Sequence, residues 1–253
     1  RVGVVCNSDG HKGRPGADFP GASFFGATGG LTCFLAPRLN RDAIFEAMRR
    51  RHHYGTTGNR MLLAVEAQLG EAGTLYLRDP AVFPSPETQR VSQVTMGDIA
   101  GVRGTEVEFS VDVVGSAPIE RLDIFDGLDL IETVRPYRPE DLGARIRVIW
   151  EGAEYRGRAR TTIWDGALKV TGNRIQRAAV LNNWNLDRGI QSRDETQIVW
   201  KAVTTGNFGG LDLWLDSASA GMLEVETRHV RREMRVGEIG LEDLVSDAGG
   251  LER

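Results

Sequence analysis

The chain has 253 residues, of which 41% are hydrophobic and 26% charged, and its net charge is −4. The apolar content excludes an intrinsically disordered chain, and the length suits two domains because a single core stops growing at about 250–300 residues. A slightly acidic net charge is not typical of a protein that coats nucleic acid. The chain also lacks an apolar run of about 20 residues, which a helix needs to cross a membrane. We therefore expect no nucleic-acid partner and no membrane insertion.

The charges are distributed unevenly along the chain. Residues 1–60 contain nine Lys or Arg against four Asp or Glu, whereas residues 61–253 contain 22 against 31. The hydrophobic pattern changes at the same place. Together these features predict two parts, residues 1–60 and residues 61–253.

The first part begins with a valine-rich stretch. Val2–Cys6 follows Arg1 directly, with no methionine or leader before it, and its composition is typical of a strand buried on both faces. The sequence therefore predicts that an N-terminal portion of the protein is missing. Any targeting signal would be missing with it, so no cellular location is predicted.

A helix is predicted over residues 41–51. Asn40 can cap its N-terminus, and the three arginines 49–51 occupy its last turn, where the helix dipole favours cations. Its expected inner face consists of Ala43, Ile44, Ala47 and Met48. An apolar run at 31–36 precedes the helix, and a short strand or turn at 52–58 follows it. This order is typical of the end of an α/β domain.

From residue 61 onwards the hydrophobic pattern has a period of two, which is typical of half-buried strands. The alternating runs are 106–113, 145–150, 211–216 and 222–228. In the third run, leucines alternate with Asp212, Trp214 and Asp216. The turn dipeptides between runs are Asp126-Gly127, Asp165-Gly166 and Gly209-Gly210. This pattern predicts a mostly antiparallel β-sandwich.

The sharpest candidate for chemistry is Ser8-Asp-Gly-His11. In an extended backbone Asp9 and His11 project to the same side, so a carboxylate and an imidazole can reach one metal ion or two adjacent ions. Such ligands suit zinc, manganese or iron. The alternative is an aspartate that caps a turn beside a solvated histidine. Lys12 and Arg14, in the same loop, either bind an anionic group of a substrate or are simply exposed.

His52 and His53 are a further pair of candidate ligands. Neighbouring residues in a strand point to opposite faces, so both cannot easily bind one ion. We expect one of them to be buried and the other exposed.

Several motifs occur together in one order. They are Ser8-Asp-Gly-His11, Gly29-Gly-Leu-Thr32, the segment 39–51 and Tyr54-Gly-Thr-Thr-Gly58. Together they resemble the C-terminal end of the PHP (polymerase and histidinol phosphatase) superfamily of metal-dependent hydrolases. More narrowly, the chain is similar to the bacterial domain-of-unknown-function family 3604, which appends a β-rich region to a PHP-like domain.

The resemblance implies an α+β protein in which the C-terminal fragment of a PHP-like (β/α) barrel precedes the β-sandwich. It also implies two or three divalent metal ions, with Asp9 and His11 as their last ligands, that hydrolyse a phosphoester, ester or carbamate bond of a small-molecule substrate. The chain departs from that pattern because none of its four histidines forms the early His-x-His pair of such a centre. We therefore expect the fragment alone to bind metal weakly or not at all and to be inactive. Whether the protein is an enzyme stays open.

The alternative hypothesis is a non-catalytic binding or structural module whose functional part is the β-sandwich. Asn182-Asn-Trp-Asn185 places amides beside an indole, and sugar rings are commonly held by stacking and hydrogen bonds of this kind. The interpretation that we favour for these residues is plainer, with asparagines forming turns around a tryptophan that closes the core. The alternative hypothesis predicts a glycan or protein partner, and the oligomeric state is not predicted.

Overall fold

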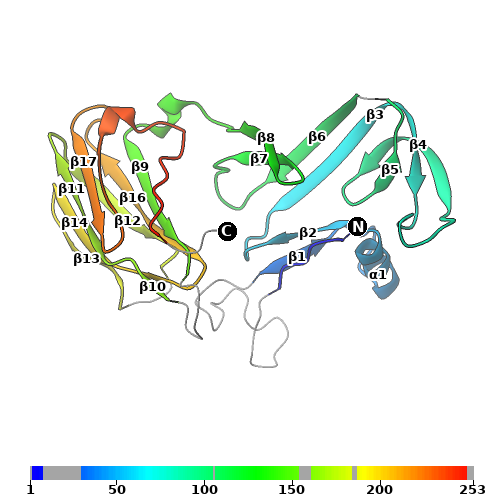
Figure 1. Ribbon diagram of the computed structural model, residues 1–253, viewed down its shortest axis with the longest axis horizontal. Helices are drawn as coiled ribbons and strands as arrows, with labels where there is room; N and C mark the ends of the chain where they lie inside the picture. The colour runs from blue at the N-terminus through cyan, green and yellow to red at the C-terminus, as the bar shows by residue number, and fades with distance from the viewer. Residues whose placement is uncertain (1, 8–29, 105, 154–160, 184–186, 250–253) are drawn as a thin grey trace. The chain divides into compact units, whose positions relative to one another are not determined.

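The computed structural model of the protein describes residues 2–7, 30–104, 106–153, 161–183 and 187–249 (Figure 1). Their contacts group them into two compact units, and the chain passes from the first unit to the second between Ile119 and Glu120. Each unit contains its own sheets.

The first unit is organised by one long strand. Its elements are β1 (Leu31–Phe34), α1 (Arg41–Arg49), β2 (His53–Thr56), β3 (Leu62–Tyr76), β4 (Thr88–Thr95), β5 (Ile99–Gly101) and β6 (Val107–Val114). Strand β3 pairs antiparallel with β4, β5 and β6, while β1 and β2 form a separate antiparallel pair. The predicted boundary near residue 60 falls in the link between β2 and β3. As a boundary between two domains, it stays a prediction.

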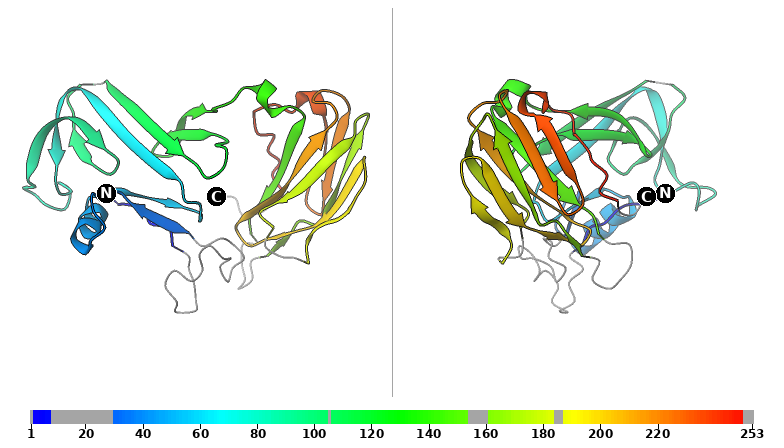
Figure 2. Two further views of the ribbon diagram at one scale, coloured as in Figure 1. Left: turned by 180° about the vertical axis from the view of Figure 1, so that it is seen from behind. Right: turned by 60° about the vertical axis from the view of Figure 1, so that its left-hand side comes forward.

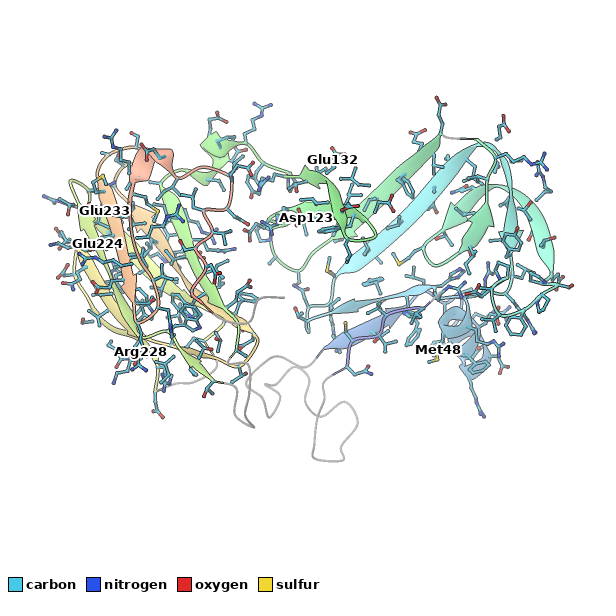
Figure 3. The ribbon with its side chains drawn as sticks, in the orientation of Figure 1. Met48, Asp123, Glu132, Glu224, Arg228 and Glu233 are labelled. Carbon is cyan, nitrogen blue, oxygen red and sulfur yellow. The ribbon has the colours of Figure 1, made fainter. Side chains whose placement is uncertain are left out.

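Helix α1 begins as the sequence predicts. Asn40 has an extended backbone, and its side-chain oxygen accepts a hydrogen bond from the N–H of Ala43 at 2.8 Å, as an N-cap does. The helix ends before Arg51, because that residue has a left-handed backbone with a φ of 62°. Of the predicted inner face, Ala47 is buried, whereas Met48 is 47% exposed (Figure 3). The predicted burial of Met48 is therefore wrong.

The prediction of a (β/α) barrel fragment is also wrong. Such a barrel is built from parallel strands, each followed by a helix. Here the strands on either side of α1 run antiparallel, with Phe34 opposite His53. The described residues form a mostly antiparallel β structure with one α-helix and no barrel. That helix has nine residues, and none in the described part of the chain is long and apolar enough to cross a membrane.

The valine-rich stretch at the start of the chain is not the buried strand that was expected. Val2 is 91% exposed and Val4 is 70% exposed. Side chains, not a neighbouring strand, bind its backbone: Thr32 Oγ1 accepts from the N–H of Cys6 at 2.9 Å, and His53 Nδ1 lies 2.9 Å from the carbonyl oxygen of Val4. Among the described residues no strand forms a backbone ladder with this stretch, and it is not a strand.

The second unit contains a β-sandwich, whose two layers Figure 2 shows, and two smaller strand pairs. Its strands are β7 (Leu122–Asp126), β8 (Asp129–Val134), β9 (Arg145–Glu151), β10 (Thr162–Ile163), β11 (Gly166–Thr171), β12 (Ile175–Leu181), β13 (Gly189–Arg193), β14 (Gln197–Lys201), β15 (Val203–Thr204), β16 (Phe208–Leu215), β17 (Met222–Thr227) and β18 (Arg231–Arg235). One sheet has the order β13-β14-β11-β17-β18 and the other β12-β16-β9. All pairings are antiparallel, as the period of two predicts.

The core of the sandwich is built from the residues that each strand turns inward. Trp150 of β9 stacks on Trp200 of β14, with ring centroids 5.2 Å apart and planes 3° apart, so the pair joins the two sheets. The Trp200 indole N–H donates to the carbonyl oxygen of Trp164 at 2.7 Å, and that of Trp164 donates to Thr204 Oγ1 at 2.8 Å. Both donors are therefore satisfied inside an apolar core.

Only one of the three predicted turns is found. Asp126-Gly127 connects β7 and β8, and its glycine has a φ of 62°. Asp165-Gly166 is not a separate turn, since its glycine already belongs to β11. Gly209 and Gly210 are buried inside β16. A Cβ on Gly210 would lie 2.5 Å from the carbonyl oxygen of Val148, so glycine here permits the close approach of two strands.

An ion-pair cluster fastens the end of α1 to the turn between β4 and β5. The side chain of Asp98 is 7% exposed, and one of its oxygens lies 2.9 Å from both Arg50 Nη2 and His52 Nε2. Its other oxygen accepts from the N–H of Thr95 at 3.1 Å. Burial by itself would raise the pKa of Asp98, but these hydrogen bonds and the nearby positive charges outweigh burial and lower it.

We predict that this cluster makes the stability of the first unit sensitive to acid. Because the pKa of Asp98 is lower in the folded chain, its contribution is complete above the unfolded-state pKa of about 3.9 and is lost as the pH falls through the folded-state value. Asp98→Asn should lower the free energy of unfolding at neutral pH by about 1.5–3 kcal/mol and flatten its acid dependence. Denaturant unfolding across pH measures both. Asp112→Asn, an exposed carboxylate on β6, is the control, and equal effects of the two variants would contradict the prediction.

Candidate functional site

The residues predicted for metal chemistry lie outside the described part of the chain. Asp9, His11, Lys12 and Arg14 all belong to the segment 8–29. Metal binding by the first two and substrate binding by the other two therefore stay predictions. Among the residues that the structure does describe, no group of three or more His, Cys, Asp or Glu side chains is placed to hold a metal ion.

His52 and His53 serve different neighbours. His52 is half-buried and lies against Asp98, while His53 is buried and faces the carbonyl oxygen of Val4. The two imidazoles do not converge on one point, so they do not form a ligand pair.

A small recess lies beside the asparagine patch in the second unit. It is lined by Trp150, Val180–Asn183, Arg188, Gly189, Trp200–Val203 and Gly209–Leu211. The space inside it that water can occupy is about 20 Å³, which is room for about one molecule. Asn182 has a φ of 51° and donates to the carbonyl oxygen of Phe208 at 2.6 Å, and Asn183 donates to that of Arg188 at 3.3 Å. Both asparagines thus hold turns, while Trp184 lies outside the described residues.

A larger polar and aromatic surface covers the outer face of the sheet β12-β16-β9. Residues opposite each other on neighbouring antiparallel strands point the same way, so they form rows across the sheet. The three rows, each written from β12 through β16 to β9, are Arg177, Trp214 and Arg145; Ala179, Asp212 and Arg147; and Leu181, Gly210 and Ile149. We call these residues the Arg–Trp face.

Asp212 anchors the two arginines of β9. It is 8% exposed, and its carboxylate accepts hydrogen bonds from Arg145 at 2.5 Å and from two nitrogens of Arg147 at 2.8 and 3.2 Å. Burial would raise the pKa of Asp212, but the hydrogen bonds from these arginines outweigh burial and lower it. Arg147 also pairs with Glu120 at 2.5 Å. Both arginines are therefore held in position by an ionised carboxylate.

Trp214 is half-buried between two cations. The guanidinium carbon of Arg177 lies 4.5 Å from the centroid of its ring, and that of Arg145 lies 5.4 Å from it. Both distances fall within the range of about 6 Å over which a cation is attracted to an aromatic ring, and each such contact contributes about 0.5–1 kcal/mol at an exposed site. The indole is therefore flanked by a guanidinium from each neighbouring strand.

Part of this site can be recognised from the sequence pattern. The alternation of leucines with Asp212 and Trp214 places these two residues on one face of a strand, and Arg145 and Arg147 alternate with apolar residues in the same way. No run of consecutive residues shows the row that contains Arg177, because its members come from strands that are far apart in the sequence.

The metal prediction leads to a direct measurement. With only Asp9 and His11 as candidate ligands, and about three protein ligands usual even for a catalytic zinc, the chain should retain less than one zinc, manganese or iron ion after dialysis. Asp9→Ala and His11→Ala should each remove the residual binding, and His229→Ala should not. Elemental analysis of the purified protein provides the measurement. One tightly held ion per chain, or binding that survives both alanine variants, would contradict it.

The comparisons with known proteins concern the first unit. Residues 11–72 match a protein-family model described as Protein of unknown function (DUF3604), a segment that contains β1, α1, β2 and most of β3. No match was found among curated proteins or among solved structures. Over the matched segment the chain is similar to that family, as its motifs predict, and the link to the PHP superfamily stays a prediction.

Proposed function

We propose that the second unit is a non-catalytic binding module that holds a glycan on the Arg–Trp face, with Trp214 as the stacking platform. The observation that carries this proposal is the position of Trp214, a half-buried indole on the outer face of the sheet between Arg177 and Arg145. Tryptophan is a large residue with an apolar body, and where it stays on a surface among polar groups it is suited to binding a partner that is apolar on one side.

The polar groups of the face can bind the hydroxyl groups of a sugar. A sugar ring has an apolar face, which an indole can cover, and a rim of hydroxyl groups that need hydrogen-bond partners. Arg145, Arg147 and Arg177 each carry five N–H donors, of which Asp212 and Glu120 use only a part. The remaining donors are available to hydroxyl groups beside the ring.

The surface next to Trp214 leaves room for a chain of sugars. The neighbouring rows contain Ala179 and Gly210, whose side chains are small or absent, and Asp212 is nearly buried. From Trp214 to Gly210 the strand extends about 13 Å, which is longer than one sugar ring. The face therefore suits an oligosaccharide better than a single sugar.

The other candidate sites support a function less well. The recess at Asn182 and Asn183 has room for about one water molecule, and its asparagines are engaged in turns. Metal-dependent hydrolysis by a longer protein remains a prediction that depends on Asp9 and His11.

The proposal is tested by affinity electrophoresis and calorimetry of the full chain against a panel of neutral and acidic polysaccharides. Trp214→Ala should weaken binding about tenfold, because loss of one aromatic stacking contact costs up to about 1.5 kcal/mol. Phe125→Ala is the matched control, since Phe125 is an exposed aromatic residue on β7 of the same unit.

Near-ultraviolet circular dichroism distinguishes a binding defect from a folding defect. The signal of the core tryptophans Trp150 and Trp200 should be unchanged in Trp214→Ala, because both indoles lie on the inner side of the sheets. A wild-type chain that binds no glycan, or a folded Trp214→Ala variant that binds as tightly as the wild type, would refute the proposal.

A further inference from the structure

We propose further that the Arg–Trp face selects acidic glycans, because Arg177 binds the carboxylate of a uronic acid whose ring stacks on Trp214. This inference rests on the proposed glycan-binding function and names the class of glycan. Three observations on the face support this inference. They are the β-bulge that turns Arg177 outward, the lack of a described carboxylate bound to Arg177, and the position of its guanidinium at the Trp214 ring.

Arg177 reaches the face through a β-bulge. The pairing of β12 with β16 shifts between Ile175 and Arg177, which makes Gln176 an extra residue in β12. With regular pairing, Gln176 would stand opposite Trp214 and Arg177 would point into the sandwich. The side chain of Gln176 is instead bound to Asp216. The bulge thus turns a cation outward at the row that contains the half-buried indole of Trp214.

The guanidinium of Arg177 differs from those of Arg145 and Arg147 because no described carboxylate binds it. Arg145 and Arg147 donate to Asp212, and Arg147 also donates to Glu120. Among the residues that the structure describes, none forms a hydrogen bond or an ion pair with the guanidinium of Arg177, which is exposed. Arg177 therefore has its hydrogen-bond donors free to bind a ligand.

The position of this charge beside the ring favours a uronic acid. A guanidinium is a planar fork that binds a carboxylate through two parallel hydrogen bonds. In a uronic acid the carboxylate is attached to the sugar ring itself. The guanidinium of Arg177 lies over the Trp214 ring, 4.5 Å from its centroid, so a stacked sugar ring would take its place. The displaced guanidinium, which is exposed and belongs to the same row, can then pair with the carboxylate beside that sugar ring. An acidic peptide brings carboxylates on flexible side chains without a sugar ring.

The test compares three ligands of the full chain by calorimetry: an oligogalacturonate, its methyl ester, and poly-glutamate. The free acid should bind at least about tenfold more tightly than the ester, and this preference should shrink as salt is added, because the charges are exposed. Arg177→Gln should weaken binding of the free acid far more than binding of the ester, and so remove the preference for the free acid. Arg177→Lys, which keeps the charge without the fork, should retain only part of it.

Arg174→Gln is the matched control, because Arg174 is an exposed arginine that precedes β12 and pairs weakly with Glu195 at 3.7 Å. It should bind all three ligands as the wild type does. Equal binding of acid and ester, an unchanged preference in Arg177→Gln, or Arg177-dependent binding of poly-glutamate as tight as that of the oligogalacturonate would each overturn the inference. If acid and ester bind equally and both need Trp214, glycan binding stands and only the selectivity fails. If no polysaccharide binds, both proposals fail.

Discussion

The stacking of Trp150 on Trp200 is the contact on which the architecture of the second unit depends. Because side chains alternate along a strand, burying Trp150 decides that Arg145 and Arg147 of the same strand face outward. The buried leucines of β16 do the same for Trp214. A slip of one residue in the strand register would place arginines in the core at a high cost in free energy. The packing of the core therefore determines which side chains lie on the outer face. The proposed binding surface is thus the outer side of strands whose inner side forms the core.

The parts of the fold that local patterns determine could be predicted from the sequence. The cap at Asn40 and the alternation in β9, β16 and β17 depend on residues within a few positions of each other, and the structure contains these elements. The direction in which two strands pair is decided by distant contacts. The motifs around α1 therefore gave no local sign that β1 and β2 run antiparallel, and the barrel expected from the resemblance was wrong.

The alternation of side chains along a strand also explains which residues of the candidate site could be predicted from the sequence. Asp212 and Trp214 follow the period of two, so their common face is visible in the sequence. Arg177 breaks the period. Counted from buried Ile175, it should point inward, and only the bulge at Gln176 turns it out. Irregularities of this kind are frequent next to functional sites, and they are invisible to any method that assumes a regular strand.

The place of β12 in its sheet gives the same bulge a second consequence. β12 is an edge strand, since β16 is its one neighbour in that sheet among the described residues. A regular, uncharged edge is a template onto which another polypeptide can add a strand, and such addition leads to aggregation. An extra residue distorts the spacing of the free N–H and C=O groups, and an arginine next to it repels a flat incoming strand by its bulk and hydration. The residue proposed to attract a ligand therefore also helps to keep the sheet from growing.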